Sequence, residues 1–132
     1  MQPIAQIEGI VQPGKRVGRT LGVPTANLPH PGEGAPPNGV YVAEVFFPDE
    51  QHRAEPAVLS QGNHPTVPGG GPTVEVFLLN CREDLYGRRL RVHYLQFIRP
   101  EEKFETRELM RQRMLKDIDE AHAYFERRNE QP

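Results

Sequence analysis

The chain has 132 residues, one cysteine, and 16 Lys and Arg against 18 Asp and Glu, for a net charge of −2. This length fits one domain, and a lone cysteine excludes an internal disulfide framework. The charge balance lacks the basic excess typical of general nucleic-acid or anionic-membrane binders. With no secretory signal and no apolar span visible, we expect a monomeric cytoplasmic domain over 1–132 that binds neither nucleic acid nor membrane.

Turn residues concentrate in the first half of the chain, where 11 of 12 glycines and 12 of 14 prolines occur by residue 72. Residues 14–34 hold so many of them that we expect no regular element there, only a functional loop. Runs of β-branched and apolar residues, and a period-two alternation in the last case, predict strands over 4–11, 39–47, 56–61, 73–79 and 89–98.

An amphipathic helix is predicted after Pro100, with Thr106 as its N-cap. Its apolar stripe recurs at spacings of four, four, three and four and comprises Met110, Met114, Ile118, Ala121 and Phe125, reinforced by Leu109, Leu115 and His122. We expect this helix, at about 106–128, to dock on a β core at about 4–99. The alternative is a helix that binds a partner or a membrane surface. Strands followed by one helix, without alternation, indicate a small antiparallel barrel or sandwich.

Cations and regularly spaced glycines share the segment that follows the first predicted strand. The glycines are Gly14, Gly18 and Gly22, and the cations are Lys15, Arg16 and Arg19. Glycines allow successive backbone N–H groups to converge on an oxyanion, and the cations would add charge for a phosphate. The segment is not a Walker A loop, because no Gly-Lys-Ser/Thr ends it. A basic, solvated loop is the alternative interpretation.

Three further positions stand out by their chemistry. Thr25 and Asn27 would project to one side of an extended segment and offer hard oxygen donors to Mg²⁺, or else stabilise a turn. Glu75 interrupts an apolar strand, so it either faces water or serves as a general base. Phe104 is an apolar ring in a charged connector, either a hydrophobic staple before the helix or a wall for a flat ligand.

Residues 18–27, GRTLGVPTAN, resemble the GR-x-LG-[FIV]-PTAN pattern of the ATP-dependent riboflavin kinase (flavokinase) family. The resemblance covers about residues 7 to 125. It includes, in the family's order, Gly39-Val40-Tyr41, Pro65-Thr66, Val74-Glu75-Val76, Asp84-Leu85-Tyr86-Gly87 and the segment from Ile98 to Phe104.

The resemblance implies a fold and a reaction. The fold would be mainly β, a six-stranded antiparallel Greek-key barrel with a C-terminal α-helix. The reaction would move the γ-phosphoryl group of ATP to the ribityl 5′-hydroxyl of riboflavin, giving FMN and ADP with Mg²⁺ as the metal. Thr25 and Asn27 would then hold the metal and phosphate oxygens, and Glu75 would accept the proton of the hydroxyl.

The resemblance also implies the binding residues. The glycine-rich loop, with Gly14, Lys15, Gly18 and Arg19, would cover the ATP phosphates, and Thr25 would contact them. Asn80 and Tyr86 would lie near the adenosine. Arg99 and Phe104 belong to the segment that would close over the flavin.

The sequence departs from the family at Ser60-Gln61-Gly62, where Asn-Ile-Gly is usual. This change motivates a second hypothesis, a non-catalytic flavin- or nucleotide-binding module on the same barrel. A third hypothesis, a barrel that binds single-stranded nucleic acid, conflicts with the net charge of −2 and the absence of Trp. Bacterial members commonly carry an FMN adenylyltransferase domain, for which 132 residues leave no room. We therefore expect a chain that stops at FMN, or an excised domain.

Overall fold

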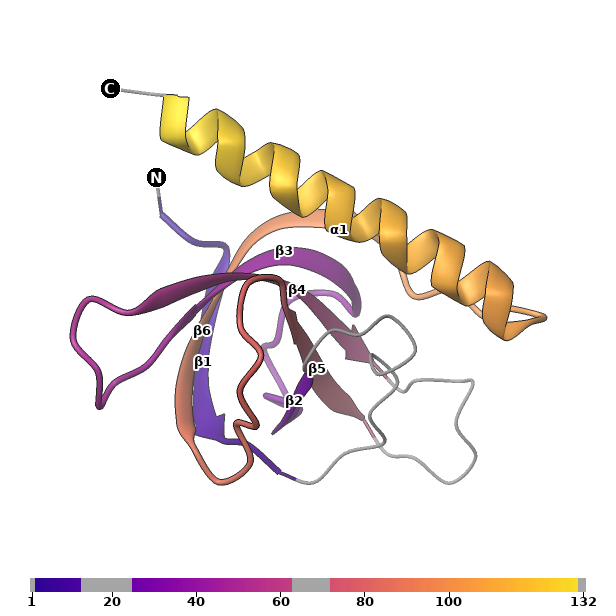
Figure 1. Ribbon diagram of the computed structural model, residues 1–132. Coiled ribbons are helices and arrows are strands. Elements are labelled where there is room, and N and C mark those ends of the chain that lie inside the picture. Colours follow the sequence, from indigo (N-terminus) through magenta and orange to yellow (C-terminus); the bar gives the residue numbers. More distant parts are fainter. Residues whose placement is uncertain (1, 13–24, 63–71, 131–132) are drawn as a thin grey trace.

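The computed structural model describes residues 2–12, 25–62 and 72–130, which form one sheet and one helix (Figure 1). The elements are β1 (Ala5–Ile10), β2 (Thr25–Pro29), β3 (Gly39–Phe46), β4 (Ala54–Gly62), β5 (Thr73–Leu78), β6 (Arg89–Arg99) and α1 (Arg107–Glu130). Every strand pair is antiparallel, and the order across the sheet is β1-β6-β3-β4-β5-β2.

The connectivity is a Greek key. Strands β3, β4 and β5 pair consecutively, and β6 returns to lie beside β3. The sheet curls into a half-barrel, where the resemblance implies a barrel. Its two edges approach at one point, where Gln12, just after β1, forms an isolated bridge with Asn27 of β2. The predicted antiparallel Greek-key fold with a C-terminal helix is confirmed.

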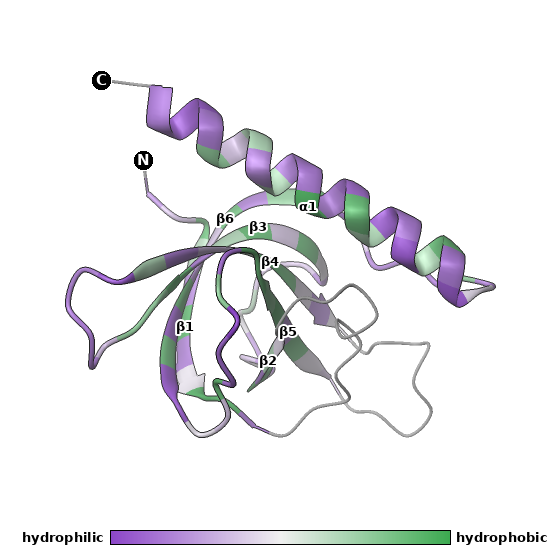
Figure 2. Cartoon of the chain, viewed as in Figure 1, coloured by the Kyte–Doolittle hydropathy of each residue, from purple (hydrophilic) through white to green (hydrophobic). Residues whose placement is uncertain are grey.

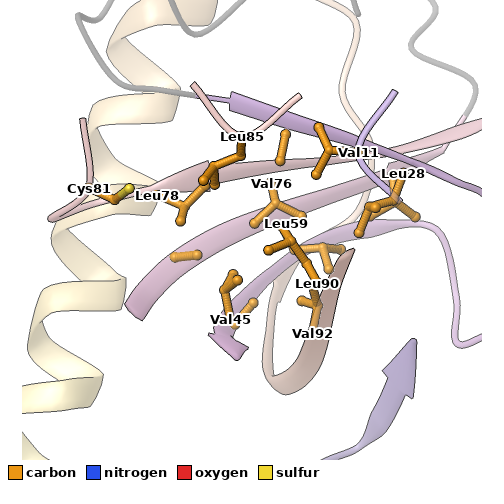
Figure 3. Close-up of a cluster of buried hydrophobic side chains, with 14 of the residues drawn as sticks. Val11, Leu28, Val45, Leu59, Val76, Leu78, Cys81, Leu85, Leu90 and Val92 are labelled. Carbon is orange, nitrogen blue, oxygen red and sulfur yellow. The ribbon is translucent and has the colours of Figure 1, made fainter. Parts of the chain in front are cut away.

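Two apolar clusters occupy the two faces of the curled sheet. The inner cluster is enclosed by the strands and includes Leu28, Leu59, Val76, Leu90 and Val92 (Figure 3). The outer cluster lies between the sheet and α1 and contains Val40, Val42, Val58, Phe77, Met114 and Ala121. Apolar positions therefore alternate with hydrophilic ones along β1 and the first half of β6, whereas β3 is mainly apolar on both faces (Figure 2).

Helix α1 begins where the sequence predicts, because the Thr106 hydroxyl accepts a hydrogen bond from the Leu109 amide at 3.1 Å. The predicted stripe packs against β3 and β4. Leu109 and Leu115, expected to reinforce the stripe, are instead 47% and 38% exposed, and His122 is exposed as well. They lie off the line that faces the sheet. Within the described residues, no helix has the combination of length and apolar character needed to cross a bilayer.

Strand β2 corrects the expectation that residues 14–34 contain no regular element. The five residues Thr25–Pro29 pair with β5. Because β2 pairs along its length only with β5, at one edge of the sheet, Pro29 can end it without removing a hydrogen bond from a neighbouring strand. Its inward positions, Ala26 and Leu28, are buried. A short edge strand with only two apolar anchors leaves little periodic signal in the sequence.

Two irregularities bend β6 where it meets β3. Register shifts occur between Val40 and Tyr41 and between Val42 and Ala43, and the extra residues in β6, Ile98 and Leu95, pack against the outer cluster. At this bend a Cβ on Gly39 would lie 2.5 Å from the carbonyl oxygen of Arg99. Only glycine permits this close approach of β3 to the end of β6. The contact fixes the point at which the last residues of β6 leave the sheet.

The structure shows how the chain accommodates Ser60-Gln61-Gly62, the segment that departs from the family pattern. Ser60 faces outward, whereas Gln61 points inward and is fully buried. Its amide nitrogen donates to the carbonyl of Pro36 at 2.7 Å, and its amide oxygen accepts a hydrogen bond from the Tyr94 hydroxyl. Burial raises the pKa of Tyr94, so this hydroxyl remains a donor over the physiological range. The polar side chain is thus satisfied within the wall of the half-barrel.

Replacing Gln61 with Met should lower the free energy of unfolding by about 1–3 kcal/mol, the cost of leaving buried polar partners unsatisfied. Urea denaturation of Gln61→Met measures the change. Because Tyr94 loses its acceptor in this variant, adding Tyr94→Phe should cost less than it does in the parent chain. Equal costs in the two backgrounds would show that the Gln61–Tyr94 hydrogen bond contributes nothing to stability.

Candidate active site

A row of polar side chains crosses three neighbouring strands on the face opposite the inner cluster. Asn27 of β2 stands opposite Glu75 of β5, and Glu75 stands opposite Ser60 of β4. Side chains directly opposite each other in antiparallel strands have Cβ atoms about 4.5–5.5 Å apart. Glu75 is only 5% exposed, so a carboxylate in the middle of this row lies out of bulk water.

Thr25 belongs to the adjacent row and stands opposite Phe77. Because Ala26 and Leu28 point into the inner cluster, the alternation of β2 turns Thr25 and Asn27 to the other face, as the sequence predicts. The hydroxyl oxygen of Thr25 and the amide oxygen of Asn27 are both hard donors. This pair fits a divalent cation that keeps several waters and shares substrate phosphates.

The turn that carries Tyr86 is tied to the same edge of the sheet. Its Gly87 amide donates to the carbonyl of Val11 at 3.0 Å, and the amide of the next residue, Gln12, donates to the carbonyl of Asn27 at 2.8 Å. The Tyr86 amide is held by the Asp84 carboxylate at 3.0 Å, and the Tyr86 ring is 63% exposed. One short segment therefore joins the predicted adenosine-binding turn to the predicted metal ligand.

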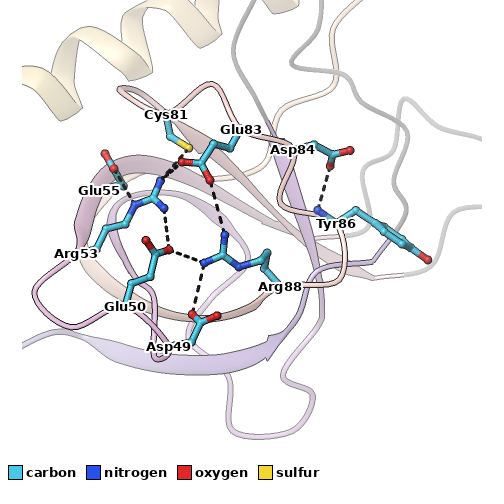
Figure 4. A network of polar contacts seen from close by, with 9 residues as sticks. All are labelled: Asp49, Glu50, Arg53, Glu55, Cys81, Glu83, Asp84, Tyr86 and Arg88. Carbon is cyan, nitrogen blue, oxygen red and sulfur yellow. Dashed lines mark hydrogen bonds and ion pairs between the residues drawn. The ribbon is translucent and has the colours of Figure 1, made fainter.

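An ion-pair network supports this turn from the other side (Figure 4). Arg53 and Arg88 both contact Glu50 and Glu83, so they connect the β3–β4 hairpin to the segment between β5 and β6. Their guanidinium groups stack on the Phe47 ring, with the Arg53 Cζ atom 4.0 Å from its centroid. The hydrogen bonds from Arg88 and Arg53 lower the pKa of Glu50. The turn is thus preorganised, while Asn80 and Tyr86 remain exposed and available for a ligand.

The connector between β6 and α1 approaches the row from the β4 end. A Cβ on Gly62 would lie 2.1 Å from the Glu101 carboxylate, so the Glu101 side chain of the connector lies directly against the end of β4. Gly62 is two residues from Ser60. Phe104 is half-buried and lies two residues before the cap Thr106, whereas a hydrophobic staple occupies the position directly before the cap. Phe104 is therefore not at the staple position, and its ring lies against the Arg99 guanidinium.

Arg99, expected beside the flavin, is buried and bonded within the chain. Its guanidinium meets the carboxylate of Asp117 on α1, at 2.8 Å from Nη2 to Oδ2. The structure thus brings Thr25, Asn27 and Glu75 together, with Tyr86 at one end and Phe104 toward the other. Gly14, Lys15, Gly18 and Arg19 lie outside the described residues.

Sequence reasoning did not single out two residues of this arrangement. Ser60 flanks Glu75, and its outward position follows from the strand alternation once the inward side of Leu59 and Gln61 is known. Asp117 is a buried acid on the apolar stripe of α1, three residues after Met114 and four before Ala121. The position of this acid on the apolar stripe is the signal that sequence analysis could have used, because a charged side chain that faces the core requires a partner.

Comparison with known proteins finds relatives of this chain. A family model described as Flavokinase: Riboflavin kinase matches residues 2–125. The bifunctional riboflavin kinase/FMN adenylyltransferase of Escherichia coli is 37% identical over 119 residues, covering 90% of this chain and 37% of the relative. The RNA-binding riboflavin kinase RibR of Bacillus subtilis is 36% identical over 121 residues, covering 91% of this chain and 51% of the relative.

Two solved structures share the fold. One, described as a macrolide-efflux protein from Streptococcus pneumoniae, superposes with a TM-score of 0.75 at 30% identity, over 91% of this chain and 38% of that one. Riboflavin kinase from Trypanosoma brucei superposes with a TM-score of 0.59 at 20% identity, over 96% and 82% of the two chains. The fold is thus a small antiparallel Greek-key half-barrel with a C-terminal helix. The chain belongs to the riboflavin kinase family.

Proposed function

We propose that this chain transfers the γ-phosphoryl group of ATP to the 5′-hydroxyl of riboflavin, giving FMN and ADP. The observation that carries the proposal is the buried Glu75 carboxylate facing Asn27 across the β2–β5 pair. The chain spans 37% of the length of the Escherichia coli relative, so the proposal concerns the kinase reaction alone.

Glu75 is suited to accept the proton of the attacking hydroxyl. Phosphoryl transfer needs alignment of the two reacting groups and neutralisation of charge, together with a group that orients the nucleophile. Glu75 lies on a central stretch of β5, between two hydrogen-bonded strands, which keeps the carboxylate in one place. Its burial excludes competing water from the hydroxyl that it would hold.

Thr25 and Asn27 would hold Mg²⁺ together with phosphate oxygens. A divalent ion there supplies charge stabilisation to the transferring phosphoryl group. Both ligands sit on the same short strand, and Asn27 is fixed at its backbone by β5 and by Gln12. The hydroxyl and amide are neutral, so the ion would retain charge for the triphosphate.

The two substrates would enter from opposite ends of this row. Asn80 and the exposed Tyr86 would contact the adenosine, with Gly14, Lys15, Gly18 and Arg19 over the phosphates. Phe104 and the connector that holds Arg99 would cover the flavin, whose large flat surface gains most from an aromatic wall. We further propose that the domain acts as a monomer in the cytoplasm, without binding nucleic acid.

The test is incubation of the purified protein with riboflavin and Mg·ATP, followed by chromatographic separation of the flavins. FMN should accumulate in proportion to ADP, and omission of the divalent metal should abolish the product. Tight riboflavin binding without any ADP release would instead select the non-catalytic binding module.

A further inference from the structure

One buried ion pair connects the middle of α1 to the end of β6. Arg99 is 8% exposed and Asp117 1%. The contact is two-pronged, with Nε to Oδ1 at 3.1 Å and Nη2 to Oδ2 at 2.8 Å. Such a fork is the strongest and most directional form of an arginine–carboxylate contact. It fixes the plane of the guanidinium as well as its position.

The fixed guanidinium in turn faces the Phe104 ring. The Arg99 Cζ atom lies 5.6 Å from the ring centroid, within cation–π range. The remaining nitrogen, Nη1, is directed to its own connector, 3.4 Å from the Pro100 carbonyl and 3.9 Å from Glu102. Arg99 therefore binds Asp117 through one edge of its guanidinium while its Cζ atom lies over the Phe104 ring.

We propose that Asp117 is a positioning residue for the flavin site: it holds Arg99 so that Phe104 stays in place as a wall. This inference rests on the proposed function. Removing one partner of a buried ion pair leaves the other charge uncompensated, and the side chain then moves toward water. Arg113 adds to this effect, because its Nε atom lies 3.5 Å from Asp117 Oδ1, so two cations depend on one carboxylate.

The chain provides a matched control at the other end of the same helix. Arg128 of α1 forms a two-pronged pair with Glu44 of β3, with distances of 2.8 and 3.0 Å. This pair also ties α1 to the sheet but contacts no residue of the 99–104 connector in the interactions described. Glu44→Gln therefore reports on helix docking alone.

The first measurement compares Asp117→Asn with Glu44→Gln in steady-state kinetics. Asp117→Asn should raise the KM for riboflavin about tenfold, the scale of a lost cation–π contact and a loosened wall. Its kcat and its KM for ATP should stay within about twofold of the parent values, because the row around Glu75 is untouched. Equal effects of the two variants on riboflavin KM would overturn the proposal.

A second variant separates positioning from stability. Replacement of a buried ion pair by apolar residues of similar size is often neutral for folding. Arg99→Met combined with Asp117→Leu and Arg113→Met, which leaves neither cation without its carboxylate, should therefore unfold near the parent urea midpoint yet show the same raised riboflavin KM as Asp117→Asn. A parent-like riboflavin KM in this folded triple variant would exclude a positioning role.

A third readout is independent of the reaction. The chain has no Trp, so Phe104→Trp introduces a single fluorescent probe at the wall. Adding Asp117→Asn should shift its emission to the red and increase quenching by acrylamide, whereas adding Glu44→Gln should not. An unchanged probe would overturn the proposal. If the probe responds but the parent chain makes no FMN, the proposed function fails while the Asp117–Arg99–Phe104 link stands.

Discussion

Glu75→Gln should lower the kcat for riboflavin phosphorylation by about 100-fold or more, the scale of lost general-base assistance. Glutamine keeps the size of the side chain and its place in β5 but cannot accept the proton. Glu75 is buried between β2 and β4, so bulk water does not readily reach its position to replace the lost carboxylate. The measurement is the rate of FMN formation at saturating Mg·ATP and riboflavin.

The matched control for this result is Glu44→Gln, the same substitution in β3. Glu44 pairs with Arg128 and lies outside the proposed site, so its loss should leave kcat unchanged. Riboflavin affinity of Glu75→Gln, followed by the quenching of flavin fluorescence, should also remain close to that of the parent. A parent-like kcat in Glu75→Gln would remove the proposed base and require another acceptor for the proton.

Asn27→Ala should raise the Mg²⁺ concentration needed for half-maximal activity by at least about tenfold, the usual cost of weakening a metal site. The side chain is one of two neutral oxygen donors that β2 presents on this face. Its backbone carbonyl, which accepts the Gln12 amide, is untouched by the substitution, so the edge of the sheet should persist. A titration of FMN formation against Mg²⁺ at fixed ATP measures the change.

Two comparisons show whether this effect is specific. Asn129→Ala, the same substitution near the end of α1, should leave the Mg²⁺ requirement as in the parent chain. Riboflavin binding by Asn27→Ala without nucleotide should also be unchanged, because the metal and phosphates are absent. An unaltered Mg²⁺ titration in Asn27→Ala would exclude Asn27 as a metal ligand. The alternative role of its side chain, stabilising the turn before β3, would then remain.

Local pattern was sufficient for most of the fold. The runs over 39–47 and 73–79 became β3 and β5, and the stripe from Met110 to Phe125 became the docked face of α1. These elements bury long apolar faces, so their periodicity is strong. The short strand β2 was not predicted, because its two inward residues, Ala26 and Leu28, are too few to show a strand periodicity. Only the pairing with β5 makes this segment a strand.

The sequence by itself determined the chemistry present: two neutral oxygen donors two residues apart, one acid in an apolar strand, and a capped amphipathic helix. Only the tertiary structure decided which groups meet. Register between β2, β5 and β4 sets Asn27, Glu75 and Ser60 in one row, and the crossing of α1 gives Arg99 its carboxylate partner. Such contacts depend on hydrogen-bonded pairing and packing between segments distant in the chain, which no local pattern encodes.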